Sequence, residues 1–96
     1  MNTTLPANMI VYLNGRFVPA PEAQISVFDR GFLFGDGVYE VLPAYGGRLF
    51  RLAPHLHRLD QSLAAVGMAP PLNHAQWTQV LSELVTRNGG GNLSVY

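Results

Sequence analysis

The first third of the chain has the pattern of a β-hairpin. Two apolar, β-rich runs, residues 9–13 and 16–18, flank the dipeptide Asn14 and Gly15. Asn-Gly favours the tight two-residue turn that joins antiparallel strands, so the chain is expected to open with a hairpin. Residues 19–22 contain two prolines and should interrupt the second strand.

A second β region follows a glycine-containing run. Residues 38–42 are apolar and β-rich and are expected to form a strand, which Pro43 should end or place at a sheet edge. Gly46 and Gly47 provide another turn into residues 48–52. The two segments are therefore expected to pair as antiparallel neighbours.

Two amphipathic helices are expected in the second half. Pro54 suits a first helical position and Gly67 a stop, and between them apolar residues recur at four- and three-residue steps: Leu52, Leu56, Leu59, Leu63 and Val66. Asn73 can cap a second helix that ends at Asn88, with the apolar face Trp77, Val80, Leu81, Leu84 and Val85. Residues 93–96 have strand composition. The predicted fold class is α+β, a small domain with an antiparallel sheet, built from the N-terminal hairpin and further strands, and two helices.

Composition limits the size of the core and the classes of partner. The 96 residues form one domain at most, and 48% hydrophobic against 12% charged residues suggests apolar surface intended for another domain or subunit. A formal net charge of zero excludes a strong electrostatic site for nucleic acid or an anionic membrane. With no cysteine and no export signal in residues 1–7, a cytoplasmic location is expected.

The most distinctive stretch of the chain is residues 29–41, with three glycines followed by a Tyr-Glu pair. It resembles the signature of fold-type IV aminotransferases, which use pyridoxal phosphate (PLP). The resemblance covers nearly the whole chain and matches the N-terminal small domain of that family. Within the stretch, residues 35–41 are most similar to the D-amino-acid aminotransferase branch. Branched-chain aminotransferases usually have a Phe-Glu-Gly version, and aminodeoxychorismate lyases more often have Phe in place of Tyr39.

The resemblance implies a parent enzyme larger than this chain. Residues 1–96 correspond to the N-terminal small domain, and the catalytic C-terminal domain is expected to lie outside the chain. All six basic residues are arginines, so no lysine is present to attach PLP and no catalytic residue is expected here. The parent would move an amino group between an amino acid, with a D-amino acid favoured, and a 2-oxo acid, and would be a homodimer.

Three residues, Arg58, Tyr39 and Tyr96, match binding positions of the family, and strand alternation adds Val41 as a fourth residue expected to line the pocket. By the resemblance, Arg58 grips the PLP phosphate, for which a guanidinium offers a planar fork of donors. Tyr39 contributes its hydroxyl to the pocket for the substrate carboxylate, and Val41 should share its strand face while Glu40 points the opposite way. Tyr96 matches a tyrosine near the substrate in some relatives. The alternatives are an arginine on a solvated helix flank, a surface tyrosine on a strand and a terminal sheet residue.

Other chemistry is not expected from these residues. Gly31, Gly35 and Gly37 have neither dinucleotide nor Walker spacing. His55 and His57 are two apart on a predicted helix and face different directions, so no metal site is expected. The rival function is a non-catalytic interaction or dimerisation module, or a truncated remnant of the enzyme. The sequence leaves open the substrate, its chirality and the choice between transaminase and lyase chemistry.

Overall fold

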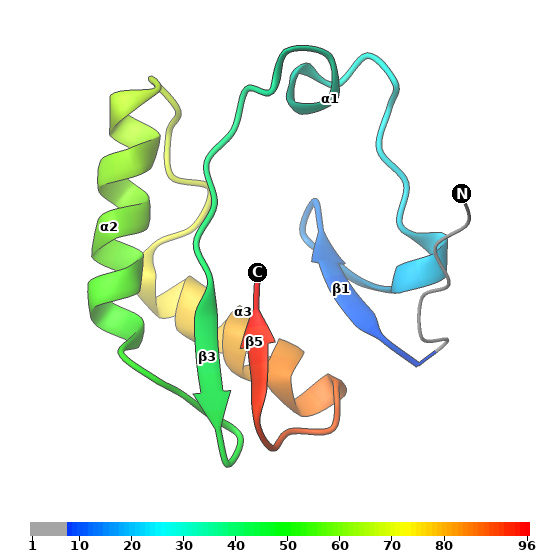
Figure 1. Ribbon diagram of the computed structural model, residues 1–96, viewed down its shortest axis with the longest axis vertical. Coiled ribbons are helices and arrows are strands. Elements are labelled where there is room, and N and C mark those ends of the chain that lie inside the picture. Colours follow the sequence, from blue (N-terminus) through cyan, green and yellow to red (C-terminus); the bar gives the residue numbers. More distant parts are fainter. Residues whose placement is uncertain (1–7) are drawn as a thin grey trace.

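The computed structural model describes residues 8–96 and has the predicted α+β architecture (Figure 1). Its elements in chain order are β1 (Ile10–Leu13), β2 (Arg16–Pro19), the short 3-10 helix η1 (Ala20–Glu22), α1 (Arg30–Phe34), β3 (Leu42–Tyr45), β4 (Arg48–Leu49), α2 (Leu52–Ala65), α3 (His74–Arg87) and β5 (Leu93–Val95). The strands form two small antiparallel sheets, β1-β2 and β4-β3-β5. None of the helices within this range is long and apolar enough to cross a membrane.

The predicted hairpin is confirmed as β1 and β2. Leu13 pairs with Arg16, and Asn14 and Gly15 have φ values of 51° and 86°, as a type I′ turn requires at both central residues. Only asparagine and glycine tolerate this left-handed conformation readily, which explains why this dipeptide sets the register of the pair.

The prediction of a strand over residues 38–42 is wrong for all but its last residue. β3 begins at Leu42 and extends to Tyr45, because a strand exists only where a neighbour pairs with it. β4 ends at Leu49, and Arg51 then adopts a left-handed φ of 56° that turns the chain into α2. Among the described residues, no strand reaches far enough to pair with residues 38–41.

Pro43 neither ends the strand nor lies at a sheet edge, because β3 is the central strand of its sheet. The Pro43 carbonyl accepts a hydrogen bond from the backbone N–H of Phe50 at 2.8 Å. In an antiparallel strand a residue's nitrogen and carbonyl face the same neighbour, so the ring nitrogen of Pro43 also faces Phe50, just beyond the end of β4. The missing donor therefore costs no hydrogen bond to β5.

Both predicted long helices are confirmed. α2 begins two residues before Pro54, which occupies its first turn, and buries Leu56 and Leu63. α3 begins after Asn73, whose side chain accepts from the Gln76 N–H while the Gln76 side chain accepts from the Asn73 N–H. This reciprocal pair satisfies two backbone donors that the first turn leaves without helical partners.

The core lies between the three-stranded sheet and α3. Val85 is 1% exposed and packs with Leu42, Ala44 and Val95. The side chain of Asn88, directly after α3, binds β1 instead, accepting from the Ile10 N–H at 2.9 Å and donating to the Ile10 carbonyl at 3.0 Å. The end of α3 thus contacts both sheets.

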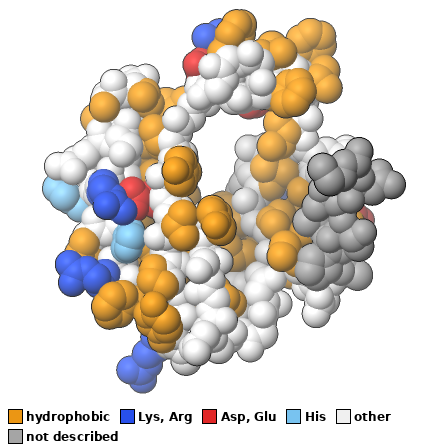
Figure 2. All heavy atoms as spheres, viewed as in Figure 1, with side chains coloured by type: hydrophobic (Ala, Val, Ile, Leu, Met, Phe, Trp, Pro, Cys, Tyr) orange, Lys and Arg blue, Asp and Glu red, His pale blue; other side chains and the backbone are white. Residues whose placement is uncertain are grey.

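Residues 23–41 form an arm that connects the hairpin to the sheet and arches over the top of the molecule (Figure 1). Its short helix α1 was not predicted; Asp29 caps its start and Gly35, with a φ of 71°, ends it. Figure 2 shows an opening beneath this arm. The arm exposes seven large apolar or aromatic side chains: Ile25, Val27, Phe28, Phe32, Leu33, Phe34 and Tyr39. Their exposure agrees with the expectation from composition that part of the apolar surface is left for another domain or subunit to cover.

The capping box of α3 generates a stability prediction. Asn73→Ala should lower the free energy of unfolding by about 1 kcal/mol, because the Gln76 N–H loses its acceptor at the helix start. Urea denaturation followed by circular dichroism measures the change. Asn73→Asp keeps an acceptor and should stay within a few tenths of a kcal/mol of the unmodified chain. Equal losses in both variants would show that the cap contributes nothing.

Candidate functional site

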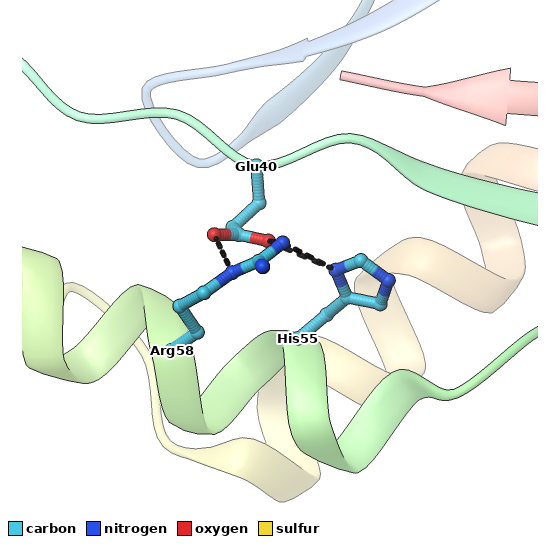
Figure 3. Close-up of polar contacts among 3 residues, drawn as sticks. All are labelled: Glu40, His55 and Arg58. Carbon is cyan, nitrogen blue, oxygen red and sulfur yellow. Dashed lines mark hydrogen bonds and ion pairs between the residues drawn. The ribbon is translucent and has the colours of Figure 1, made fainter.

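The densest polar cluster joins the end of the arm to α2 (Figure 3). Glu40 accepts two hydrogen bonds from Arg58, from Nε to Oε2 and from Nη2 to Oε1, both at 2.8 Å. The Nδ1 atom of His55 lies 2.8 Å from Oε1 of the same carboxylate. Glu40 therefore has its two oxygens held by two side chains of one helix.

Local geometry explains why these residues meet. His55 and Arg58 are three residues apart on α2, so they share one face. Glu40 lies on the side of its segment that also carries Leu42 and Ala44, whose side chains are buried in the core against α3. His57 belongs to a different face of α2 and is exposed.

Hydrogen bonds from two side chains of α2 make the Glu40 carboxyl more acidic than usual. The Arg58 hydrogen bonds, followed by the bond from His55, lower the pKa of Glu40 to about 2, although its burial opposes the shift. The same pairing raises the pKa of Arg58 above its ordinary value. The Glu40 side chain is 14% exposed and that of Arg58 is 64% exposed. A carboxylate that stays ionised needs a proton on Nδ1 of His55, which fixes that nitrogen as a donor.

The pairing leaves Arg58 with unused donors. Glu40 occupies the edge of the guanidinium formed by Nε and Nη2. The other edge, formed by Nη1 and the second N–H of Nη2, takes part in neither bond, and the side chain is mostly exposed. A guanidinium held by one edge and open at the other can bind two oxygens of an anion without further ordering.

The face of the sheet opposite the helices is where we place the other three predicted site residues, Tyr39, Val41 and Tyr96. Because side chains alternate, Tyr39 and Val41 face away from the helices that Glu40 and Leu42 approach. Leu42 pairs with Val95, so continuing this register by one residue places Tyr96 opposite Val41. The helix-free face of the sheet thus collects three predicted site residues, and Tyr39 and Tyr96 are 80% and 89% exposed.

The structure does not place Arg58 on that face. Arg58 lies on α2, on the opposite side of residues 39–41, and its hydrogen bonds to Glu40 connect the helix to that segment. Glu40 faces α2, where Arg58 and His55 bind it, and this partnership was not predicted from the sequence. A carboxylate that is shielded from water needs a cation nearby. The expectation that Glu40 points opposite to Tyr39, together with His55 and Arg58 three residues apart on one helix, could therefore have predicted this pairing.

The low pKa of Glu40 makes the cluster sensitive to acid. A carboxyl group with a pKa of about 2 in the fold against 4.5 normally stabilises the fold above pH 4.5 and loses that contribution as the pH falls toward 2. Glu40→Gln should therefore be less stable than the unmodified chain at pH 7, and the difference should shrink toward zero by pH 2. Urea denaturation at a series of pH values measures it.

Asp36→Asn is a matched control for that experiment. The Asp36 carboxylate pairs with Arg30 at 2.7 Å on the exposed arm, where water screens the interaction. Replacing the Asp36 carboxylate should change the free energy of unfolding less than Glu40→Gln does at pH 7, and with a weaker dependence on pH. A Glu40→Gln difference that is constant between pH 2 and pH 7 would rule out the linkage.

Comparison with known proteins places the chain in a family. The sequence profile described as Amino-transferase class IV matches residues 37–96. D-alanine aminotransferase of Bacillus licheniformis is 42% identical over 91 residues, covering 91% of this chain and 32% of that protein. A Methanocaldococcus jannaschii protein with a provisional branched-chain-amino-acid aminotransferase name is 41% identical over 80 residues, covering 83% and 28%.

Solved structures agree with these sequence matches. The branched-chain aminotransferase of Thermoproteus uzoniensis, solved with norvaline, superimposes with a TM-score of 0.80 at 32% identity, covering 90% of this chain and 31% of that one. Another branched-chain amino acid aminotransferase, solved with pyridoxamine 5'-phosphate, has a TM-score of 0.81 at 32% identity, covering 93% and 31%.

These matches extend over most of this chain but only part of each relative. The chain spans about a third of the length of the relatives it matches. The profile covers more than half of the chain and includes Tyr39, Glu40 and Arg58, so this protein belongs to the class IV aminotransferase family.

Proposed function

We propose that residues 1–96 are the small N-terminal domain of a PLP-dependent aminotransferase that moves an amino group between an amino acid and a 2-oxo acid. The observation that carries the proposal is the guanidinium of Arg58, fixed by Glu40 and open along its second edge. A fixed, permanently charged fork suits the phosphate end of this cofactor. Family membership and a relative solved with pyridoxamine 5'-phosphate support the choice of ligand.

The residues present fit the cofactor at its phosphate end only. Arg58 would hold the phosphate, and Glu40 and His55 would keep the guanidinium in place. When bound, PLP supplies an aromatic ring that withdraws electrons from the substrate's α-carbon. The amine that anchors the cofactor and transfers protons must come from outside these 96 residues, because the chain contains no lysine.

The helix-free face of the sheet would hold the substrate. The hydroxyl of Tyr39 donates one hydrogen bond and carries no charge, which suits a carboxylate that also needs a separate cation. Val41 would supply an apolar wall beside it, and Tyr96, opposite Val41 in the register, would bound the same pocket. Both tyrosines are exposed enough to reach a ligand.

A D-amino acid is the proposed substrate class. The form of residues 35–41 and the 42% identity to a D-alanine aminotransferase support it. A branched-chain amino acid is the second candidate, because a relative of comparable identity and both solved structures have branched-chain names. We also propose that the intact enzyme is a homodimer, which would cover apolar surface that the single chain exposes.

The phosphate assignment predicts a selective loss of cofactor. In the intact enzyme, Arg58→Ala should weaken PLP retention at least about tenfold, because a charge-assisted contact to the phosphate is lost. Arg16→Ala is the control, since Arg16 is exposed at the start of β2, in the hairpin that Figure 1 shows on the opposite side from α2. Absorbance titration of the cofactor measures both. Equal retention in the two variants would remove Arg58 from the phosphate site.

The pocket assignment predicts a change in substrate binding alone. Tyr39→Phe in the intact enzyme should reduce kcat/KM for D-alanine by roughly ten- to a hundredfold while PLP stays bound, because one hydrogen bond to a charged group is lost. Steady-state kinetics with D-alanine and with its amine analogue lacking the carboxylate distinguish a lost hydrogen bond to the carboxylate from a general structural effect. The analogue should be turned over equally by both proteins. Equal slowing of the two substrates would make Tyr39 a structural residue.

A further inference from the structure

The chain contains two asparagines that are directly followed by glycine, Asn14 and Asn88. In such a pair the backbone nitrogen of the glycine can attack the side-chain amide carbon of the asparagine. Glycine favours this attack because it has no Cβ to obstruct the approach of its nitrogen. The two pairs have the same covalent structure, so their surroundings in the fold decide whether each of them reacts.

The first pair lies at the tip of the β1-β2 hairpin, where both Asn14 and Gly15 are exposed. The ladder of the hairpin ends at Leu13 and Arg16, so the N–H of Gly15 takes no part in it. Within residues 8–96, nothing hydrogen-bonds to this N–H or to the side chain of Asn14. The two groups that must react are therefore both open to water.

The second pair is held on every side that the reaction uses. The Asn88 side chain accepts from the Ile10 N–H and donates to the carbonyls of Ile10 and Leu84, at 2.9, 3.0 and 2.8 Å. The attacking group is also occupied, because the Gly89 N–H donates to the Thr86 carbonyl at 3.1 Å. Asn88 can react only after these bonds have broken.

We propose that Asn14 is a site of spontaneous covalent modification by water and that the fold protects Asn88 from the same reaction. The Gly15 nitrogen forms a bond to Cγ of Asn14 and loses its proton, while the bond from Cγ to Nδ2 breaks and ammonia leaves. Water then opens the resulting cyclic imide. Breaking its nitrogen bond to Cγ gives aspartate, and breaking the bond to the backbone carbonyl carbon gives isoaspartate. The net change is the hydrolysis of one amide.

The two products change the hairpin differently. Aspartate adds one acidic group to a chain with 6 basic and 6 acidic residues, but it keeps the backbone and tolerates the left-handed φ of 51° at this position. Isoaspartate adds a methylene group to the backbone of the turn. Because turn length fixes the register of a hairpin, only isoaspartate should disturb the pairing of Leu13 with Arg16. The inference is independent of cofactor binding.

The experiment compares the two asparagines within one protein. The intact enzyme is incubated at mildly alkaline pH, which favours loss of the glycine N–H proton, and peptide mass spectrometry follows both sites. Asn14 should convert at least about tenfold faster than Asn88, because three side-chain hydrogen bonds protect Asn88. In urea, which unfolds the chain, the two rates should become similar. Equal rates in the native enzyme, or conversion of Asn14 in urea alone, would overturn the proposal.

Two variants at position 14 complete the test. Asn14→Gln should not form the new acidic species in ion-exchange chromatography, because its longer side chain closes a ring less readily; an acidic species that persists would also overturn the proposal. Asn14→Asp has the charge of both products and a normal backbone. Amide exchange of Arg16, measured by NMR, should be about tenfold faster or more in the isoaspartate form and unchanged in Asn14→Asp, with the Val85 amide reporting that the core stays folded. Equal Arg16 exchange in the two would contradict the effect on the hairpin.

Discussion

The packing of α3 against the three-stranded sheet is the contact on which the other features depend. Val85 is nearly inaccessible and touches the central and edge strands through Leu42 and Val95. This contact fixes which side of residues 40–44 faces the helices. Once Leu42 and Ala44 are directed into the core, alternation also directs Glu40 toward α2. A buried apolar contact therefore determines where a charged group is placed.

The placement divides one short segment between two environments. Glu40 is held by Arg58 and His55 on the helix side, and Tyr39 and Val41 face the open side of the sheet. An extended chain advances by about 3.3 Å per residue, so covalent geometry fixes the offset between the two sides. The positions of Tyr39 and Val41 relative to Glu40 are therefore set by the backbone that they share, without a separate packing contact.

Turns and helix caps, which depend on residues close together in the chain, were predicted from the sequence. The limits of the strands depend on pairing partners far along the chain and were not predicted correctly. The turn at Asn14 and Gly15 and the cap at Asn73 depend on residues close in the chain, and both occur as expected. Residues 38–41 have strand composition, but the left-handed turn at Arg51 ends β4 too early to pair with them. The helix α1 spans five residues, too few for an apolar stripe to be detected. The family signature assigned roles to Arg58 and Tyr39, and these roles stay predictions.

The side chain of Asn88 has a consequence for solubility. By binding both backbone groups of Ile10, it occupies the part of the β1 edge where a foreign strand could otherwise begin to add. Exposed edges are where β proteins polymerise, and natural sequences protect them with charges, bulges or covering segments. Here an amide following a helix serves that purpose. A single side chain thus covers two backbone groups on one edge of the hairpin that would otherwise be open to a foreign strand.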